Sequence, residues 1–93
     1  MLKHNIYFEG QVQSVGFQRL GRLQSVGVVE KGEFRFGTEA AERMHVISGE
    51  FLVKRENDEN FQVFPAGTYF EIPADSHFLV RVIGPTAYWC EYL

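Results

Sequence analysis

Residues that favour turns recur along this chain at intervals too short for an ordinary helix, and this spacing constrains the fold more than any other feature. Between them lie short runs rich in Phe, Val, Ile, Tyr and Thr, which favour strands. No segment keeps a helical apolar period for three turns. The sequence therefore predicts one all-β domain, residues 1–93, with short strands joined as hairpins in a sandwich or barrel. The turn signals are Gly10, Gly16, Gly21, Gly27, Gly32, Gly37, Gly49, ENDEN (56–60), PAG (65–67), PAD (73–75) and GP (84–85).

A two-residue period separates an inner from an outer face in each predicted strand. In residues 42–48, Glu42 shares the inner face with Met44 and Val46, whereas Arg43 and His45 point outward. A carboxylate on an apolar face costs free energy unless something binds it. Two interpretations stay open: Glu42 lies half solvated at the mouth of the core or bonded to a tyrosine, or it binds a ligand. The same period turns inward Phe34, Phe36, Phe78, Val80, Val82, Tyr88, Cys90 and Tyr92.

Composition and charge limit the partners of this chain. Hydrophobic residues make up 45% of it, and the net charge is −3 without any basic run, so a nucleic-acid polymer is not expected as a ligand. The start, MLKHNIYFEG, lacks the apolar region of a signal peptide, and no run approaches the length of a membrane span. Cys90 is the single cysteine and cannot form an internal disulfide. We therefore expect a cytoplasmic location and no membrane association.

Two spacings resemble the motifs of the cupins, small RmlC-like jelly rolls, or double-stranded β-helices, that can hold a ligand inside. Glu42-x6-Gly49 matches the first motif and Gly67-x5-Pro73 the second. The histidine positions of these motifs fall on Phe36, Thr38 and Phe78. A transition metal needs about three or four ligands in one place, and Glu42 is the one candidate there. The resemblance therefore predicts a cupin without a metal, and a metal enzyme such as a dioxygenase is disfavoured.

A narrower resemblance covers almost the whole chain, from Asn5 to Leu93. The sequence is similar to the pyrimidine/purine nucleoside phosphorylases, a family of small cupins. That resemblance implies phosphorolysis of purine and pyrimidine nucleosides to a free base and ribose 1-phosphate. It also implies a homodimer that needs no cofactor. The similar segments are SVGF (14–17), SVGVV (25–29), GEFRFGTEAAERMHVISGEFLV (32–53), FPAGTYFEIPADSHFLVRV (64–82) and PTAYWCEYL (85–93).

Roles can be assigned to individual residues by asking what this reaction needs. Cleavage of an N-glycosidic bond develops positive charge on the sugar, which a carboxylate such as Glu42 stabilises. A flat base needs an aromatic face, and phosphate needs donors such as arginine. The predicted catalytic residues are Glu42 and Tyr88, the predicted substrate-binding residues are Phe36, Thr38, Phe78, Ser48 and Tyr92, and the predicted phosphate-binding residues are Arg22 and Arg43.

Each of these assignments has a plainer alternative. The phenylalanines can be ordinary core filling, the tyrosines can cap the core, and the arginines can be solvated surface charges that reach the site only through loops or a second subunit. The alternative function is a non-catalytic, metal-free cupin that binds a small sugar-like or aromatic metabolite.

Overall fold

A computed structural model describes all residues, 1–93, and it is built almost entirely of strands. One short 3-10 turn, η1, is the single helical element, and residues 38–41 form a loop between two strands. The predicted all-β class is thus confirmed. The elements are β1 (Lys3–Tyr7), η1 (Phe8–Gly10), β2 (Val12–Arg19), β3 (Arg22–Val29), β4 (Gly32–Gly37), β5 (Glu42–Ser48), β6 (Glu50–Arg55), β7 (Gln62–Pro65), β8 (Tyr69–Ile72), β9 (His77–Val82) and β10 (Thr86–Tyr92).

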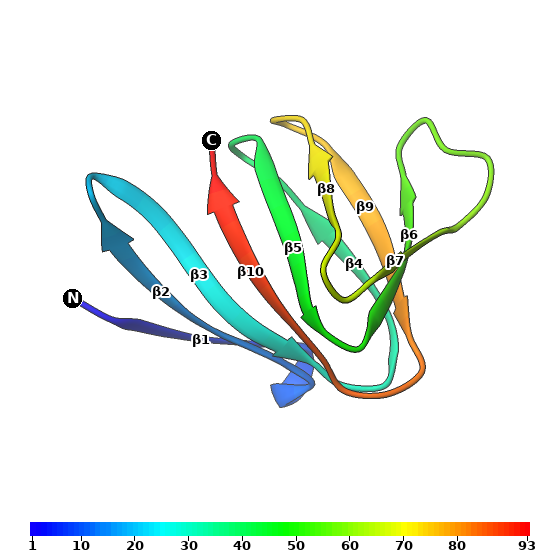
Figure 1. The fold of residues 1–93 in the computed structure, drawn as a ribbon, viewed down its shortest axis with the longest axis horizontal. Coiled ribbons are helices and arrows are strands. Elements are labelled where there is room, and N and C mark those ends of the chain that lie inside the picture. Colours follow the sequence, from blue (N-terminus) through cyan, green and yellow to red (C-terminus); the bar gives the residue numbers. More distant parts are fainter.

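The strands form two packed antiparallel sheets (Figure 1). The larger sheet has the order β1-β2-β3-β10-β5-β8, and the smaller has the order β4-β9-β6-β7. β10 therefore lies between β3 and β5, which are distant from it in sequence. In Figure 1, β1, β2 and β3 form one side of the molecule, away from β6 and β7.

The core lies between the sheets and follows the alternation expected from the sequence. Met44 and Val46 of β5, Phe78 and Val80 of β9, and Cys90 of β10 are buried. Burying such side chains stabilises the fold by about 1.5–3 kcal/mol for each large one. Arg43 and Arg81 lie on the outer faces, where each forms an ion pair. The alternation predicted from the sequence therefore gives the correct inner face in three of the longer strands.

Glycine makes one of the turns possible. Gly49 joins β5 to β6 with φ at +89°, a conformation that residues with a side chain rarely adopt. A Cβ there would also lie 2.6 Å from the Thr86 hydroxyl.

The structure contains no helix with the length and apolar character that crossing a membrane requires.

Candidate functional site

A cavity of about 260 Å³ opens between the two sheets. That volume is slightly below the roughly 300–1,000 Å³ of ordinary ligand pockets. Its walls come from β1, β2, β3, β4, β5, β6, β9 and β10 and from the turn at η1, and most of the lining residues are apolar. The lining residues are Tyr7, Phe8, Ser14, Val29, Arg35, Phe36, Gly37, Glu42, Met44, Phe51, Phe78, Val80, Tyr88, Cys90 and Tyr92.

Glu42 is the carboxylate in this cavity. It begins β5 and pairs with Tyr92 at the end of β10, while Met44 pairs with Cys90 on the same two strands. The Cys90 thiol donates to the Glu42 carboxylate across an Sγ–Oε1 distance of 3.5 Å. Burial raises the pKa of Glu42 above its ordinary value, and the Cys90 hydrogen bond offsets part of that rise. The carboxylate is half buried and has no basic partner among the ion pairs of the structure.

Two tyrosines and a thiol lie on β10: Tyr92 and Cys90 are near Glu42, and Tyr88 is further along the strand, opposite Val46. Burial raises the pKa of Tyr92 to about 12, and a hydrogen bond with Ser25 at 3.3 Å opposes that rise. Burial likewise raises the pKa values of Tyr88 and Cys90 well above their ordinary values. All three groups therefore stay protonated near neutral pH, so they can donate hydrogen bonds. A protonated thiol is a poor nucleophile.

Gly27 determines where the Tyr88 ring can lie. The two residues are cross-strand partners on β3 and β10. A Cβ on residue 27 would lie 2.6 Å from both Cζ and the hydroxyl oxygen of Tyr88, and 2.7 Å from the backbone oxygen of Gln13. The missing side chain therefore leaves the space that the phenol occupies.

Phenylalanine rings form one wall. Phe36 and Phe78 face each other across β4 and β9, with ring centroids 5.5 Å apart. Phe36 is half buried, whereas Phe78 is only 2% exposed and also packs against Phe70. Phe36 therefore has surface left for a ligand, and Phe78 acts mainly as core beneath it.

Two of the predicted hydroxyl residues are not brought to the cavity. The Thr38 side chain is buried in the loop after β4, where it donates to the Pro73 carbonyl at 2.7 Å and accepts from the Ser76 amide at 3.0 Å. Ser48 is exposed at the far end of β5, because the pairing with β10 shifts register between Ala87 and Tyr88. Neither residue is among those that line the cavity.

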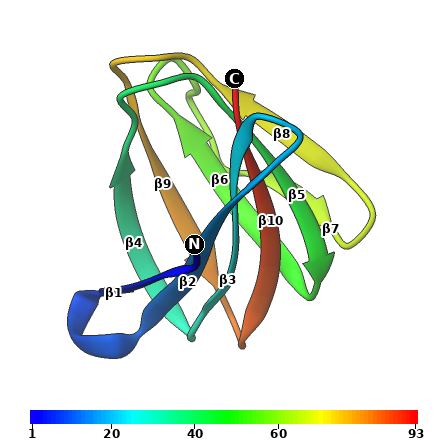
Figure 2. The same ribbon diagram turned by 90° about the vertical axis from the view of Figure 1, so that its left-hand side faces the viewer.

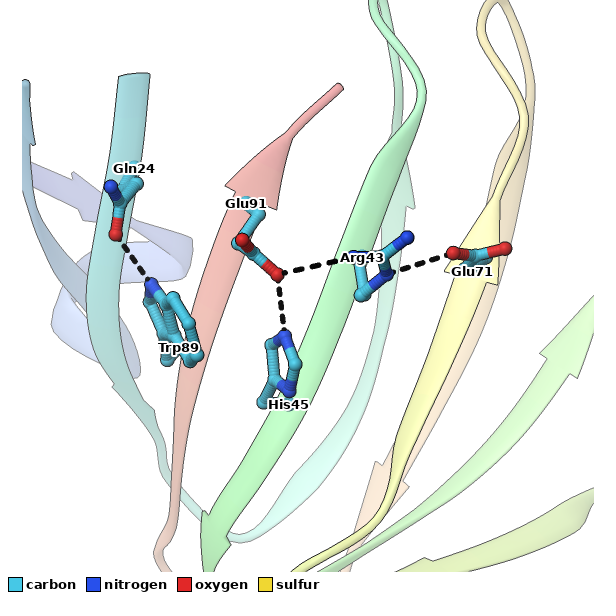
Figure 3. Close-up of polar contacts among 6 residues, drawn as sticks. All are labelled: Gln24, Arg43, His45, Glu71, Trp89 and Glu91. Atoms are coloured by element: carbon cyan, nitrogen blue, oxygen red, sulfur yellow. Dashed lines mark hydrogen bonds and ion pairs between the residues drawn. The ribbon is translucent and has the colours of Figure 1, made fainter. Parts of the chain in front are cut away.

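The two predicted phosphate ligands also lie elsewhere. Arg43 points outward from β5 (Figure 3), where it pairs with Glu71 at 2.8 Å and with Glu91 at 3.6 Å. Arg22, at the start of β3, is exposed and contributes to lowering the pKa of Glu91. Both lie away from the cavity lining, so the geometry of a single chain gives no support to their predicted role in binding phosphate.

The histidines do not gather around Glu42. His45 stacks on Trp89 with ring centroids 4.3 Å apart and bonds to Glu91 at 2.7 Å on the outer face (Figure 3). His77 lies 3.4 Å from Glu56, and His4 bonds to Gln13. No three His, Cys, Asp or Glu side chains come together as a metal site would need.

Sequence similarity decides the family. The model of the pyrimidine/purine nucleoside phosphorylase family matches residues 2–92. The chain belongs to this family. A relative of that name from Anaeromyxobacter sp. is 58% identical over 93 residues, which are 100% of this chain and 89% of the relative. Another from Photobacterium profundum is 50% identical over the full length of both chains.

Solved structures agree on the fold of this family member. A protein of unknown function from Vibrio parahaemolyticus superposes with a TM-score of 0.97 at 43% identity, covering 100% of this chain and 99% of that one. An RmlC-like cupin from Shewanella frigidimarina gives a TM-score of 0.75 at 16% identity, covering 99% and 83%. The second likeness concerns the fold alone, and it confirms the predicted cupin architecture.

Several residues that line the cavity could not be identified from strand alternation, and four of them have polar or aromatic side chains that matter for a ligand: Tyr7, Phe8, Ser14 and Arg35. Ser14 points inward from β2, and Arg35 is the one basic residue of the lining. Alternation had turned Arg35 away from Phe34 and Phe36, but β4 is an edge strand next to the cavity. Tyr7 and Phe8 lie at the end of β1 and in the turn that follows, where no periodic pattern could identify them.

Proposed function

We propose that this protein cleaves the N-glycosidic bond of purine and pyrimidine nucleosides with inorganic phosphate, giving a free base and ribose 1-phosphate. The observation that carries the proposal is the cavity in which one half-buried carboxylate meets two protonated phenols and an aromatic wall. Family membership supports the reaction class, because relatives at 50–58% identity are named for it.

Glu42 is proposed to stabilise the sugar. Its carboxylate can accept hydrogen bonds from the ribose hydroxyls and can face the positive charge that develops as the bond to the base breaks. Such an electrostatic interaction is stronger in a cavity sheltered from water than in bulk solvent. Because burial makes ionisation of Glu42 costly, a developing cation beside it restores part of the lost stabilisation of the charge.

The phenols of Tyr88 and Tyr92 are proposed to act as donors. Both lie on β10 and remain protonated at neutral pH; Tyr92 is the cross-strand partner of Glu42, and Tyr88 lines the same cavity further along the strand. One can donate to the leaving base and the other to phosphate. Phe36 is proposed to provide part of an aromatic surface for the base, which suits purines and pyrimidines alike because every base has a π face.

Phosphate needs further hydrogen-bond donors, and Arg35 is the basic residue that lines the cavity. It has no ion-pair partner in the structure and stands at the edge of the cavity beside Phe36. A guanidinium can bind phosphate with two parallel hydrogen bonds. Tyr88, Tyr92 and Ser14 are the hydroxyl donors available to complete the site.

We further propose that the protein is a cytoplasmic homodimer. The buried, unpaired thiol of Cys90 suits a reducing compartment. Three exposed valines, Val15, Val26 and Val28, lie close together on β2 and β3 next to Trp89 of β10. An apolar cluster of this kind on a small domain favours contact with a second copy.

The experiment is to incubate the purified protein with uridine or adenosine, with and without phosphate, and to measure free base and ribose 1-phosphate. We expect both products, and only when phosphate is present. Release of base without phosphate would instead indicate a hydrolase. Binding without any release of base would favour the non-catalytic cupin. The matched variants are Glu42→Gln, expected to lose activity, and Glu71→Gln on the outer face, expected to keep it.

A further inference from the structure

The turn between β1 and β2 has a strained backbone. Three consecutive residues adopt positive φ angles: Phe8 at 51°, Glu9 at 57° and Gly10 at 91°. Only glycine adopts this conformation without a steric cost, and for a bulky residue it is an outlier. Such strain persists where surrounding contacts hold it, and it concentrates at functional sites.

Local hydrogen bonds hold this turn in place. The Gln11 amide donates to the Phe8 carbonyl at 3.1 Å, and the Gln13 side chain donates to the Gly10 carbonyl at 3.1 Å. Neither bond requires an aromatic side chain at residue 8. The position of the ring is therefore a separate feature of the turn.

The turn directs the Phe8 ring from the larger sheet towards the smaller one. The ring centroid lies 5.0 Å from that of Phe34 and 5.8 Å from that of Phe36, both on β4. Figure 2 shows η1 beside the lower part of β4. Phe8 lines the cavity and is still 43% exposed, whereas Phe78 is 2% exposed. Phe8 thus offers the aromatic face that Phe78 cannot.

We propose that Phe8 is a substrate-contacting residue, whose exposed ring is the surface on which the nucleobase stacks. This inference rests on the proposed function, and it adds a binding residue from outside both sheets to the nucleoside site. Because stacking does not read the hydrogen-bonding edge of a base, Phe8 would serve purine and pyrimidine nucleosides equally.

The test uses two variants, Phe8→Leu and Phe8→Ala. Leucine keeps apolar cover over Phe34 and Phe36 but has no π face. It also tolerates this backbone, since Leu20 of the same chain adopts φ 53°. In both variants we expect the KM for uridine and for adenosine to rise about 5- to 150-fold, the range that corresponds to removal of a stacking aromatic side chain. The KM for phosphate should stay constant.

The matched control is Leu20→Ala, which alters an exposed side chain on a left-handed backbone that is not part of the cavity lining. This variant should leave the KM values for uridine, adenosine and phosphate unchanged. A folded Phe8→Leu variant with wild-type KM for both nucleosides would overturn the proposal and assign the ring to packing alone.

Calorimetric titration of uridine and adenosine, without phosphate, separates this inference from the proposed function. If the wild-type chain releases no base, the proposed function fails, while weaker nucleoside binding to Phe8→Leu would still support the contact. Absence of nucleoside binding to the wild-type chain would overturn both.

Discussion

Glu42 couples the chemistry of the site to the stability of the chain. Its pKa is raised in the folded state, because burial disfavours the charged form. The protonated form does not carry that cost. It therefore contributes stability that is fully present below the ordinary glutamate pKa of 4.5 and is lost as the pH rises through the raised folded pKa. A permanently neutral side chain at this position would not lose it.

We therefore expect Glu42→Gln to reduce turnover about 100-fold or more and to be more stable than the wild type at pH 7. The difference in stability should shrink as the pH falls from the raised folded pKa towards 4.5, and it should be absent below about 4.5, where the wild-type carboxyl is protonated in both the folded and the unfolded chain. Urea unfolding at pH 7 and pH 4 measures this difference. Equal midpoints at pH 7 would show that burial of the carboxylate costs the fold nothing.

Gly27 provides a second prediction at the scale of one residue. Gly27→Ala would place a methyl group 2.6 Å from the Tyr88 phenol and 2.7 Å from a backbone oxygen, so the ring must move. We expect a loss of about 1–3 kcal/mol in the free energy of unfolding, as for other overpacked sites, together with a large loss of turnover.

The control is Gly16→Ala on the neighbouring strand β2. Its added carbon would meet nothing closer than 3.8 Å, which is ordinary contact. Thermal unfolding of the two variants should differ clearly. A Gly27→Ala variant with wild-type stability and turnover would mean that Tyr88 is neither fixed by this contact nor needed where it lies.

At the scale of elements, strand alternation explains what could be predicted and what could not. It placed Glu42, Phe36, Tyr88 and Tyr92 on one cavity, because residues two apart on a strand share a face. It misplaced Ser48 because a register shift interrupts the pairing of β5 with β10. Strand alternation makes no prediction for Thr38, because this residue lies in a loop. Its hydroxyl forms hydrogen bonds with the backbone of Pro73 and Ser76.

The outer face of β5 and β10 carries a polar network that is separate from the cavity (Figure 3). The hydrogen bond from His45, and then the charges of Arg43 and Arg22, hold the pKa of Glu91 below its ordinary value. The ionised carboxylate therefore contributes stability that is present above pH 4.5 and lost as the pH falls through the lowered folded pKa.

We expect Glu91→Gln to lower stability at pH 7 by about 0.2–1 kcal/mol, as exposed ion pairs do. The difference in the free energy of unfolding between this variant and the wild type should disappear in acid, where the wild-type carboxyl is also protonated. Nucleoside KM should not change, because Glu91 lies on the opposite face of β10 from Tyr88 and Tyr92. Denaturant titrations across pH, together with steady-state kinetics, check both parts, and a changed KM would contradict the separation of the two faces.

At the scale of the whole molecule, sequence similarity identified the family and the cupin fold, whereas the site depended on where strands meet. Residues from eight strands and one turn line the cavity. Nothing in the local sequence indicates that the turn at Phe8 reaches β4, or that the edge strand β4 brings Arg35 to the same opening. Those contacts are set by the packing of the two sheets.

A small domain with an exposed apolar cluster favours association. We expect light scattering at micromolar concentration to give about twice the chain mass of 10.7 kDa. A mass of one chain across the range used for kinetics would contradict the proposed homodimer and would require each chain to provide the whole site alone.

The central position of β10 in the larger sheet has a consequence for biosynthesis. Until residues 86–92 leave the ribosome, β3 and β5 have no common neighbour, and each presents an open edge. The same segment carries Tyr88, Cys90 and Tyr92. A nascent chain therefore acquires its continuous six-stranded sheet and its complete cavity only when residues 86–92 insert between β3 and β5, and a polypeptide stopped before Thr86 would have neither.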